Sequence, residues 1–467
     1  MPLARLGVRR HHRAVLFRPG RHARPSLRRR RREGLPGCHR GRVRRCFDDP
    51  GPVRRRDRRP ERRRRQATRP VQGRDRDHRG RGRLPRRRPP PSAPGKADRL
   101  VTTSLLGTTP RESVWTGPVV DADVHAQVPS ASALFPYLAQ QWIDWCTERN
   151  WRTPPGPGQH FPPNSPRTCR PEWRPDDGRV PASELALLQE HVLDPWRVDA
   201  AILNCYYGID SIRQPDWVNA MASAVNDWLV HEWLAKDARL HGSLVLPVRD
   251  PEAMVREIHR LGDQPQIKQV LLPARSDLLW GRRIHLPVFR AAVEHDLVVG
   301  LHYGGTADGV PSTTGYPSYF IEEYAGEWQS FATQVTSMVV EGLLQELPDL
   351  RVSVIEGGFL WLPAWGWRMN KDWKGLRREV PWLSEPPMDV IRRHFRFSAV
   401  PAELGPPEAA RHLQNALGWL RSDDLLMFAT DYPRGHDDDV DRLLAGLPDP
   451  ARPKLMAETA RAWYRLP

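Results

Sequence analysis

From Val119 to the end of the chain, short apolar runs alternate with longer segments whose apolar residues recur every three or four positions. The short runs are rich in β-branched residues, which is typical of strands buried on both faces of a sheet. Eight strands are predicted in this way: Val119–His125, Val198–Cys205, His241–Pro247, Ile267–Pro273, Leu297–Tyr303, Arg351–Gly357, His394–Ser398 and Leu425–Asp431. Strands that alternate with helices indicate βα units and a parallel sheet.

The longer segments predict helices that would cover such a sheet. Pro215–Arg239 carries a stripe of large apolar side chains, and Pro251–Leu261 follows Asp250, a residue suited to cap a helix N-terminus. Pro287–His295 and Phe331–Leu347 show the same apolar spacing. Eight such units match an α/β fold, the (β/α)8 TIM barrel, with an open doubly wound sheet as the alternative. No GxGxxG motif follows the first strand, so the alternative lacks its best marker.

A proline-rich insertion follows the first predicted strand. Residues 151–181 include nine prolines, which predicts a loop or an extended lid rather than core structure. In a barrel this segment would lie over the carboxyl ends of the strands, where active sites form.

The charge of the chain divides it into two parts. The first hundred residues hold 36 Lys and Arg against 8 Asp and Glu, whereas the rest of the 467 residues carry an excess of 11 acidic residues. We therefore predict a disordered Arg- and Pro-rich segment over 1–100 and a barrel over 115–467. GC-rich DNA that is translated in a frame not selected for protein gives a similar Arg- and Pro-rich sequence. One interpretation of residues 1–100 is therefore a mis-assigned start, with translation beginning at Val101. A genuine disordered segment and a functional basic arm are the alternatives.

Several classes of protein do not fit this composition. All Trp and Tyr residues lie after residue 100, so the basic segment has no platform on which bases could stack, and we do not expect a nucleic-acid partner. No run of about 18 apolar residues predicts a membrane span, and no apolar core of a secretory signal is present near the start. Five scattered cysteines without a CxxC pair favour a reducing compartment, so we expect a cytoplasmic protein.

Polar side chains interrupt the first apolar strand. Asp121, Asp123 and His125 alternate by two, so we expect them to share one face of that strand. Buried polar groups are costly unless something satisfies them, and a divalent metal ion is one solution. A hydrogen-bonded polar cluster is the other.

Three further predicted strands end in a group that can bind a metal ion. His302 ends the fifth strand before a Gly-Gly pair, Glu356 ends the sixth, and Asp431 ends the eighth. Because the carboxyl ends of barrel strands meet on one face, these side chains are expected to converge with Asp123 and His125. The convergence favours a metal site over a chance arrangement.

The motifs DADVH, GLHYGG, LPDLRVSVIEGGFLWLPAWGWRMNKDW, EVPWL and LLMFATDYP together resemble the amidohydrolase-related family, whose members include aminocarboxymuconate-semialdehyde decarboxylase and resorcylate-type decarboxylases. The resemblance implies a (β/α)8 barrel in which Asp123, His125, His302 and Asp431 hold one divalent metal ion, Zn²⁺ first and Mn²⁺ as the alternative. It also implies a small-molecule substrate and a homodimer. No lysine of the kind that bridges two metals is visible in the fourth strand, which favours one metal ion.

Two departures from the family pattern concern the chemistry. Glu356 stands where many relatives have a histidine that donates a proton, and Arg434 follows Asp-Tyr-Pro where relatives tend to have histidine. We expect Asp431 to act as general base, Glu356 to act as an acid or substrate contact, and His436 to take over part of the missing histidine's role.

The substrate pocket is less defined by the sequence. Seven tryptophans follow the fourth to sixth strands and would suit a planar substrate, or else they pack helices onto the barrel: Trp280, Trp328, Trp361, Trp365, Trp367, Trp373 and Trp382. Trp361 and Arg275 are the predicted substrate contacts, with Arg275 binding a carboxylate or, alternatively, forming an ion pair on the protein surface. The main expectation is hydrolysis of a small organic substrate by metal-activated water, and the alternative is non-oxidative decarboxylation. A basic arm that binds nucleic acid is the third hypothesis.

Overall fold

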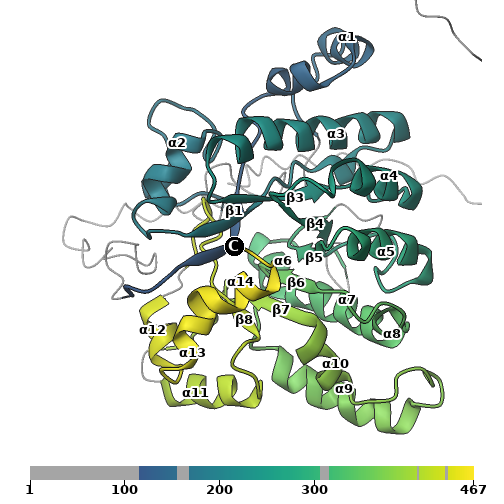
Figure 1. Cartoon of the computed structure of the whole chain (residues 1–467), viewed down its shortest axis with the longest axis vertical. Helices are drawn as coiled ribbons and strands as arrows, with labels where there is room; N and C mark the ends of the chain where they lie inside the picture. The colour runs from purple at the N-terminus through teal and green to yellow at the C-terminus, as the bar shows by residue number, and fades with distance from the viewer. Residues whose placement is uncertain (1–114, 155–167, 306–314, 407–409, 437–439) are drawn as a thin grey trace, which may run out of the picture. The chain divides into compact units, whose positions relative to one another are not determined.

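The structure is a computed structural model that describes residues 115–154, 168–305, 315–406, 410–436 and 440–467 (Figure 1). The predictions for residues 1–100, and for the middle of the proline-rich insertion, lie outside the described residues. Among the described helices, none has the length and the apolar character needed to span a membrane.

Eight parallel strands form the sheet, and each pairs with the next one along the chain. They are β1 (Val120–His125), β2 (Ala200–Asn204), β3 (Leu240–Val245), β4 (Ile267–Pro273), β5 (Val298–His302), β6 (Val352–Ile355), β7 (Phe395–Ser398) and β8 (Leu426–Met427). The backbone of Ala122 donates to Phe428 O at 2.9 Å, and that of His125 donates to Tyr432 O at 2.8 Å. These bonds bring β1 against the segment of β8, so the sheet closes into a (β/α)8 TIM barrel. The predicted fold is confirmed, and the open sheet is excluded.

Helices surround the strands (Figure 1). They are α1 (Gln140–Glu148), α2 (Leu185–Leu188), α3 (Pro215–Glu232), α4 (Pro251–Leu261), α5 (Leu286–Glu294), α6 (Phe320–Gly326), α7 (Trp328–Val340), α8 (Leu343–Glu346), α9 (Leu362–Leu376), α10 (Pro387–His394), α11 (Ala410–Trp419), α12 (Val440–Ala445), α13 (Ala451–Pro453) and α14 (Thr459–Trp463). The bounds of α4 agree with the prediction, and the Asp250 carboxylate accepts a hydrogen bond from the Ala253 amide at 3.0 Å as its N-cap.

Two predicted helices differ from the structure at their ends. The helix predicted over Phe331–Leu347 begins earlier, at Trp328, and breaks into α7 and α8 at Gly342, whose φ of 87° is left-handed. Glycine adopts that conformation at low cost, so the chain turns there instead of continuing the helix. The helix predicted to reach Arg239 ends at Glu232 and continues only as a short turn over Leu234–Lys236.

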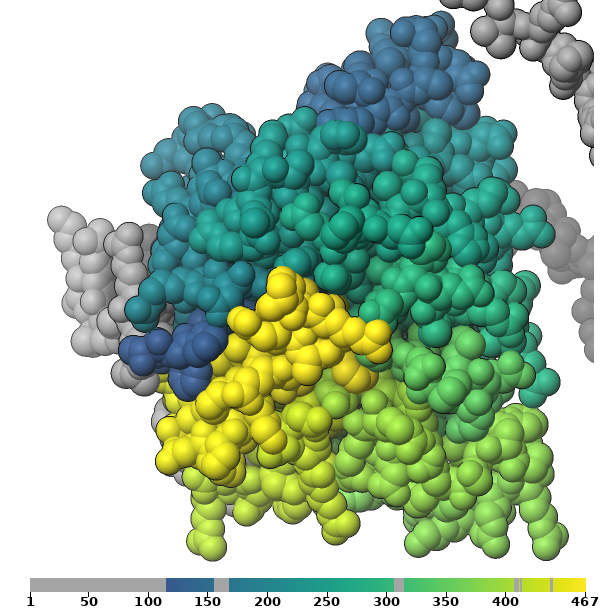
Figure 2. Space-filling view, in the orientation of Figure 1, coloured from purple at the N-terminus to yellow at the C-terminus, as the bar shows by residue number. Residues whose placement is uncertain are grey.

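The C-terminal segment closes the end of the barrel where the strands begin. Trp463 and Tyr464 belong to a buried cluster with Val120, at the start of β1. The Tyr464 hydroxyl bonds Gln269 Oε1 at 3.0 Å and Ser353 Oγ at 2.9 Å, inside the barrel. In Figure 2 the C-terminal segment, in yellow, covers the middle of the face toward the viewer. Access to the barrel interior is therefore expected at the opposite end, where the strands finish.

Candidate metal centre and active site

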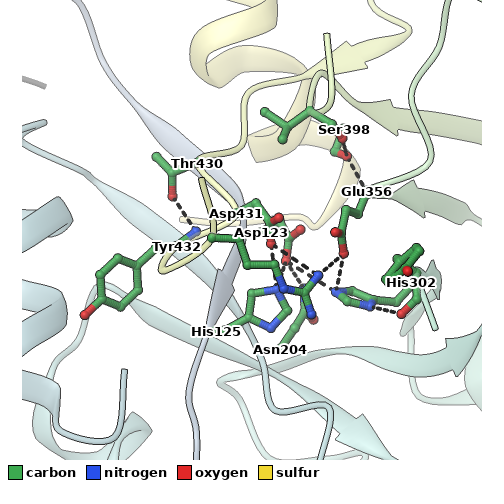
Figure 3. Close-up of polar contacts among 12 residues, drawn as sticks. Asp123, His125, Asn204, His302, Glu356, Ser398, Thr430, Asp431 and Tyr432 are labelled. Carbon is green, nitrogen blue, oxygen red and sulfur yellow. Dashed lines mark hydrogen bonds and ion pairs between the residues drawn. The ribbon is translucent and has the colours of Figure 1, made fainter. Parts of the chain in front are cut away.

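Five buried side chains converge at the carboxyl ends of the strands, where Figure 3 shows them pointing toward one another. Asp123 and His125 lie on β1, His302 ends β5, Glu356 follows β6 and Asp431 follows β8. His125 Nε2 lies 2.8 Å from Asp431 Oδ1 and 3.5 Å from Asp123 Oδ1. His302 Nε2 lies 3.8 Å from Asp123 Oδ1 and 3.9 Å from Glu356 Oε2. The structure thus brings together all four residues expected to bind a metal ion, with Glu356 beside them.

The expectation that Asp121 shares a face with His125 is wrong, because the pairing of β1 with β2 shifts by one residue. Asp121 pairs with Ala201 and His125 pairs with Asn204, and the shift lies between Asp121 and Val124. Residues 201 and 204 are three apart on a regular strand, so they point to opposite faces of the sheet. A bulge in β1 therefore turns Asp121 away from the cluster.

Asp121 instead joins β1 to the loop after β8. Its carboxylate accepts hydrogen bonds from the Thr430 amide at 3.0 Å, the Thr430 hydroxyl at 2.7 Å and the Asp123 amide at 3.1 Å. Burial raises the pKa of Asp121 to about 7, although the bonds from Thr430 oppose this rise. These contacts hold the backbone of Asp123 and of the segment before Asp431 in place.

The donor set fits a divalent metal ion. Asp123, His125 and His302 offer ligand atoms within 4.8 Å of one another, and so do His125, Glu356 and Asp431. Within the described part of the chain, Asp123 Oδ2 and His302 Nε2 are buried and have no hydrogen-bond partner. Buried polar atoms are nearly always satisfied in native proteins, so these two atoms indicate where a cation would bind.

Neighbouring groups orient these two candidate ligands. His302 Nδ1 lies 2.8 Å from the Tyr303 carbonyl oxygen, which can only accept a hydrogen bond. Nδ1 therefore carries the proton, and the lone pair of Nε2 faces the cluster. The amide of Asn204 donates to Asp123 Oδ1 at 2.8 Å, which leaves Oδ2 free. Such contacts orient metal ligands and tune their basicity.

The protonation states agree with this interpretation. Burial lowers the pKa of His302 well below its ordinary value, and the neighbouring His125 and Arg434 also oppose its protonation. Burial and Arg434 also lower the pKa of His125. Both imidazoles are therefore neutral near pH 7, which is the form that binds metal ions. Burial and the neighbouring charge of Asp431 raise the pKa of Asp123 well above its ordinary value, and a cation would offset that repulsion.

Glu356 forms an ion pair with Arg434, which the sequence marked only as a departure from the family pattern. Arg434 Nη1 also lies 3.8 Å from Asp431 Oδ1. Burial raises the pKa of Glu356 to about 7, while Arg434 opposes the rise and Asp431 adds to it. The Glu356 amide donates to Ser398 Oγ at 2.9 Å, which anchors its backbone to the end of β7.

Asp431 is surrounded by hydrogen-bond donors and cations. His436 Nε2 lies 2.6 Å from Asp431 Oδ2, on the side away from His125. Burial alone would raise the pKa of Asp431, but Arg434, His125 and His436 outweigh it and hold that pKa well below its ordinary value. His436 Nδ1 lies 3.1 Å from the Tyr324 hydroxyl. The structure thus places His436 against Asp431, and its catalytic role stays a prediction.

Glu356 and Asp431 both adopt left-handed backbone conformations, with φ of 59° and 52°. This region is strained for residues with a side chain, and such residues concentrate at active sites and ligand clamps. The strain after β6 and after β8 supports a functional role for this face of the barrel.

A cavity of about 710 Å³ opens beside the cluster. Glu356 and His436 line it on the cluster side, and Trp328 and Trp361 form an aromatic wall with ring centres 6.2 Å apart. Trp361 thus lines this cavity, and its contact with substrate stays a prediction. A larger cavity of about 810 Å³ beside Trp151 is not lined by any residue of the cluster, so the smaller one is the better candidate for the substrate.

Arg275 lies outside the cluster. Its guanidinium pairs with Glu323 at 2.8 Å and lies 3.9 Å from Glu327, and its side chain is only 10% exposed. Arg275 does form an ion pair, but the pair is buried and does not lie on the surface as the alternative drawn from the sequence expected. Its contact with substrate stays a prediction.

The described part of the proline-rich insertion lies beside the loop that follows β8. The Arg170 amide donates to Pro433 O at 2.8 Å, and the rings of Trp173 and Tyr432 lie 5.1 Å apart. This contact puts residues 168–173 at the end of the barrel that carries the cluster. A lid function for the insertion remains a prediction.

Asn204 is a contributor to the site that sequence reasoning missed, and Arg434 is one that it noted only as a departure from the family pattern. Asn204 ends the otherwise apolar strand AAILN, so the same strand-end rule that found His302 could have found it. Arg434 gave no comparable signal, because its pairing with Glu356 joins residues 78 positions apart.

The sequence profile of the amidohydrolase family matches residues 120–466, which is most of the chain and all eight strands. A search of curated protein sequences gives no significant match.

Solved structures with similar folds include three of known source. 2,6-Dihydroxybenzoate decarboxylase from Rhizobium is 16% identical with a TM-score of 0.53 over 75% of this chain and 99% of its own. An amidohydrolase from Mycobacterium avium subsp. paratuberculosis is 19% identical with a TM-score of 0.54 over 75% and 98%. 5-Carboxyvanillate decarboxylase from Novosphingobium aromaticivorans, complexed with manganese, is 17% identical with a TM-score of 0.53 over 75% and 96%. At these identities the likeness supports the fold.

Proposed function

This chain belongs to the amidohydrolase family, and from that premise we propose that it is a metal-dependent decarboxylase that removes CO₂ from an aromatic carboxylic acid without oxidation. The observation that carries the proposal is the buried cluster of potential metal ligands, with its unpartnered Asp123 Oδ2 and His302 Nε2, beside an aromatic cavity. Two of the similar folds are decarboxylases of hydroxylated aromatic acids. These two enzymes favour decarboxylation, which was the alternative drawn from the sequence, over hydrolysis, which was the main expectation.

We assign Asp123, His125, His302 and Asp431 as the residues that would hold one divalent cation. A set of two imidazoles and two carboxylates suits either Mn²⁺ or Zn²⁺. We propose Mn²⁺ because the carboxyvanillate decarboxylase was found with manganese. Such a cation supplies an electrophilic contact for an oxygen of the substrate.

Glu356 is the proposed proton donor. Decarboxylation replaces a bond between a ring carbon and the carboxyl carbon with a bond to hydrogen. In the proposed step Glu356 gives its proton to the ring carbon. The bond to the carboxylate then breaks, its electron pair stays with the ring, and CO₂ leaves. A pKa near 7, raised by burial, lets Glu356 hold that proton near neutral pH, and Glu356 lines the substrate cavity.

The test is CO₂ release by the full chain loaded with Mn²⁺ or Zn²⁺, on a panel that includes 2,6-dihydroxybenzoate and 5-carboxyvanillate. We expect turnover of at least one acid, with a loss of about a hundredfold or more in kcat for Glu356→Gln at unchanged metal content. Glu346→Gln, on α8, is the matched control and is expected to keep wild-type kcat. A fully active Glu356→Gln would overturn its role as proton donor, and metal-loaded protein that releases no CO₂ from any acid would overturn the proposed reaction.

Hydrolysis is the second candidate, because Asp431 lies within hydrogen-bond distance of His125 and His436, and a carboxylate beside a histidine can relay a proton taken from water. The same preparations assayed on esters, lactones and amides separate the two reactions. Hydrolysis without CO₂ release would favour this second function.

A further inference from the structure

Glu327 is a buried carboxylate for which the proposed reaction gives no role. It lies between α6 and α7, is 5% exposed, and lines the same cavity as Glu356. Among the residues that the structure describes, neither of its carboxylate oxygens has a hydrogen-bond partner. The hydroxyl of Tyr303, which lines the same cavity, is likewise buried without a partner.

Arg275 forms a long ion pair with Glu327 but no hydrogen bond to it. Arg275 Nε lies 3.9 Å from Glu327 Oε1, beyond hydrogen-bond distance, and Arg275 Nη1 donates to Glu323 at 2.8 Å instead. Burial raises the pKa of Glu327 to about 8, although Arg275 opposes the rise. A buried polar group without a hydrogen bond destabilises the protein, so a ligand that supplies the missing hydrogen bond is expected at this position.

The surroundings of Glu327 suit a planar ring. The rings of Tyr303 and Tyr324 lie 5.7 Å apart, and the wall of Trp328 and Trp361 adjoins them in the same cavity. Aromatic side chains of this kind bind flat ligands, while a few polar groups fix the orientation of the ligand.

We propose that Glu327 and Tyr303 form a polar subsite that binds a hydroxyl or amino substituent on the ring of an aromatic acid whose carboxylate lies at the metal-ligand cluster. This inference rests on the proposed function for the identity of the substrate. An oxygen of the Glu327 carboxyl group accepts a hydrogen bond from the substituent, and the Tyr303 hydroxyl can donate to the substituent or accept from it. An apolar substituent would leave both groups unpaired. A hydroxyl or amino group also shares its lone pair with the ring, which makes a ring carbon easier to protonate.

The experiment measures binding rather than turnover, by calorimetry on the full Mn²⁺-loaded chain. The probes are benzoate, its three hydroxy isomers, its three amino isomers, and the three methylbenzoates as apolar ligands of matched size. We expect at least one hydroxy- or aminobenzoate to bind about tenfold or more tightly than the methylbenzoate of the same position. Glu327→Leu is expected to reduce that preference to within about twofold.

Glu327→Gln tests whether a hydrogen-bond acceptor at this position is sufficient. The amide oxygen of glutamine still accepts a hydrogen bond from a hydroxyl or from the neutral amino group of an aminobenzoate. This variant is therefore expected to keep most of the wild-type preference, and a preference lost as completely as in Glu327→Leu would overturn the proposed hydrogen bond. Glu323→Gln is the matched control because Glu323 contacts the same Arg275 but does not line the cavity. It is expected to keep the wild-type preference.

Thermal unfolding distinguishes a binding role from a structural one. Glu327→Leu removes an unsatisfied buried group and is expected to keep or raise the midpoint, whereas loss of a structural ion pair would lower it. A preference that persists in Glu327→Leu, or benzoates that bind with no preference or not at all, would overturn the inference. If hydroxy- or aminobenzoates bind more tightly than methylbenzoates but no acid releases CO₂, the proposed reaction is overturned and the proposed subsite is retained.

Discussion

Arg434, in the loop after β8, forms a buried ion pair with Glu356, at the end of β6, and this pair closes one side of the metal-ligand cluster. The Glu356 side chain is 1% exposed and that of Arg434 is 22% exposed. Arg434 also lies 3.8 Å from Asp431, so its guanidinium is the counter-ion of two carboxylates at the ends of two strands. The position after Asp-Tyr-Pro, where the family resemblance implies a histidine, carries a permanent positive charge in this chain.

Arg434→Met is expected to destabilise the fold. The change leaves Glu356 buried without its cation, and removing one partner of a buried ion pair costs about 3–5 kcal/mol in the free energy of unfolding. Partial exposure of Arg434 puts the expected loss at the lower end of that range. Urea unfolding of wild type and variant measures it.

The double variant Arg434→Met with Glu356→Gln is the control, because it removes both charges together. It is expected to recover most of the lost free energy of unfolding, since glutamine needs no counter-ion. A double variant as unstable as Arg434→Met alone would show that the ion pair is not the cause.

Asn204→Leu is expected to weaken metal binding while the ligands remain. Asn204 donates to Asp123 Oδ1 and accepts from Ser243 Oγ at 2.6 Å, so its amide is fixed in orientation. Loss of such an orienting contact lowers metal affinity by about 10- to 100-fold. A competition titration with a chelator measures the affinity for Mn²⁺.

Asn226→Leu is the matched control for Asn204→Leu. Asn226 is equally buried and hydrogen-bonded, but its partners are Val245 and Glu257 outside the cluster. It is expected to lower stability and to leave metal affinity within about twofold of wild type. Equal losses of affinity in both variants would mean that Asn204 acts through general destabilisation.

The strands and most of the site could be predicted because a parallel barrel imposes a strong pattern on its sequence. Strands buried on both faces are apolar, so a polar residue at a strand end, such as His302, stands out from its surroundings. The same pattern could not reveal the bulge in β1, because a register shift depends on how Asp121 pairs with Ala201 across the sheet. Gly342 is a residue at which a helix can end, but the apolar spacing continues on both sides of it. The spacing therefore predicted one unbroken helix where the structure has two.

The pair of Arg434 and Glu356 shows a second limit. Each residue is an ordinary charged residue in its own segment, and their contact exists only because the barrel brings the ends of β6 and β8 together. The unpartnered state of Glu327 is likewise a property of its surroundings in three dimensions. Residue type and spacing therefore predict which groups face the site, and the structure is needed to show which of them are satisfied.

His302→Ala is expected to abolish metal binding. The full-length wild type should carry about one equivalent of divalent metal per chain, and the variant should carry almost none, because His302 supplies a ligand atom to the cluster. Elemental mass spectrometry after dialysis measures the content. His394→Ala is the control, since His394 is buried against Leu350 O outside the cluster. Metal that stays bound in His302→Ala would contradict the assigned ligand set.

Stability is expected to fall as the pH is lowered, in part because of His285. Burial, with a smaller contribution from Arg282, lowers the pKa of His285 to about 4, and its ring lies 4.7 Å from that of Trp280. The folded state therefore holds this imidazole neutral, while the unfolded chain takes up a proton below about pH 6.5. The stability that it contributes is complete above pH 6.5 and is lost as the pH falls from there toward 4. Between pH 7.5 and pH 5 this amounts to about 1–2 kcal/mol in the free energy of unfolding.

His285→Phe tests the origin of that pH dependence, because phenylalanine keeps a ring beside Trp280 and cannot bind a proton. The variant is expected to lose less free energy of unfolding than wild type between pH 7.5 and pH 5, by about 1–2 kcal/mol, in matched urea titrations. His231→Phe is the control, since His231 lies on the surface and takes the same substitution. Because its change is far from the buried ring of His285, this control should keep the pH dependence of wild type. Identical pH profiles for wild type and His285→Phe would show that His285 is protonated equally in the folded and unfolded states.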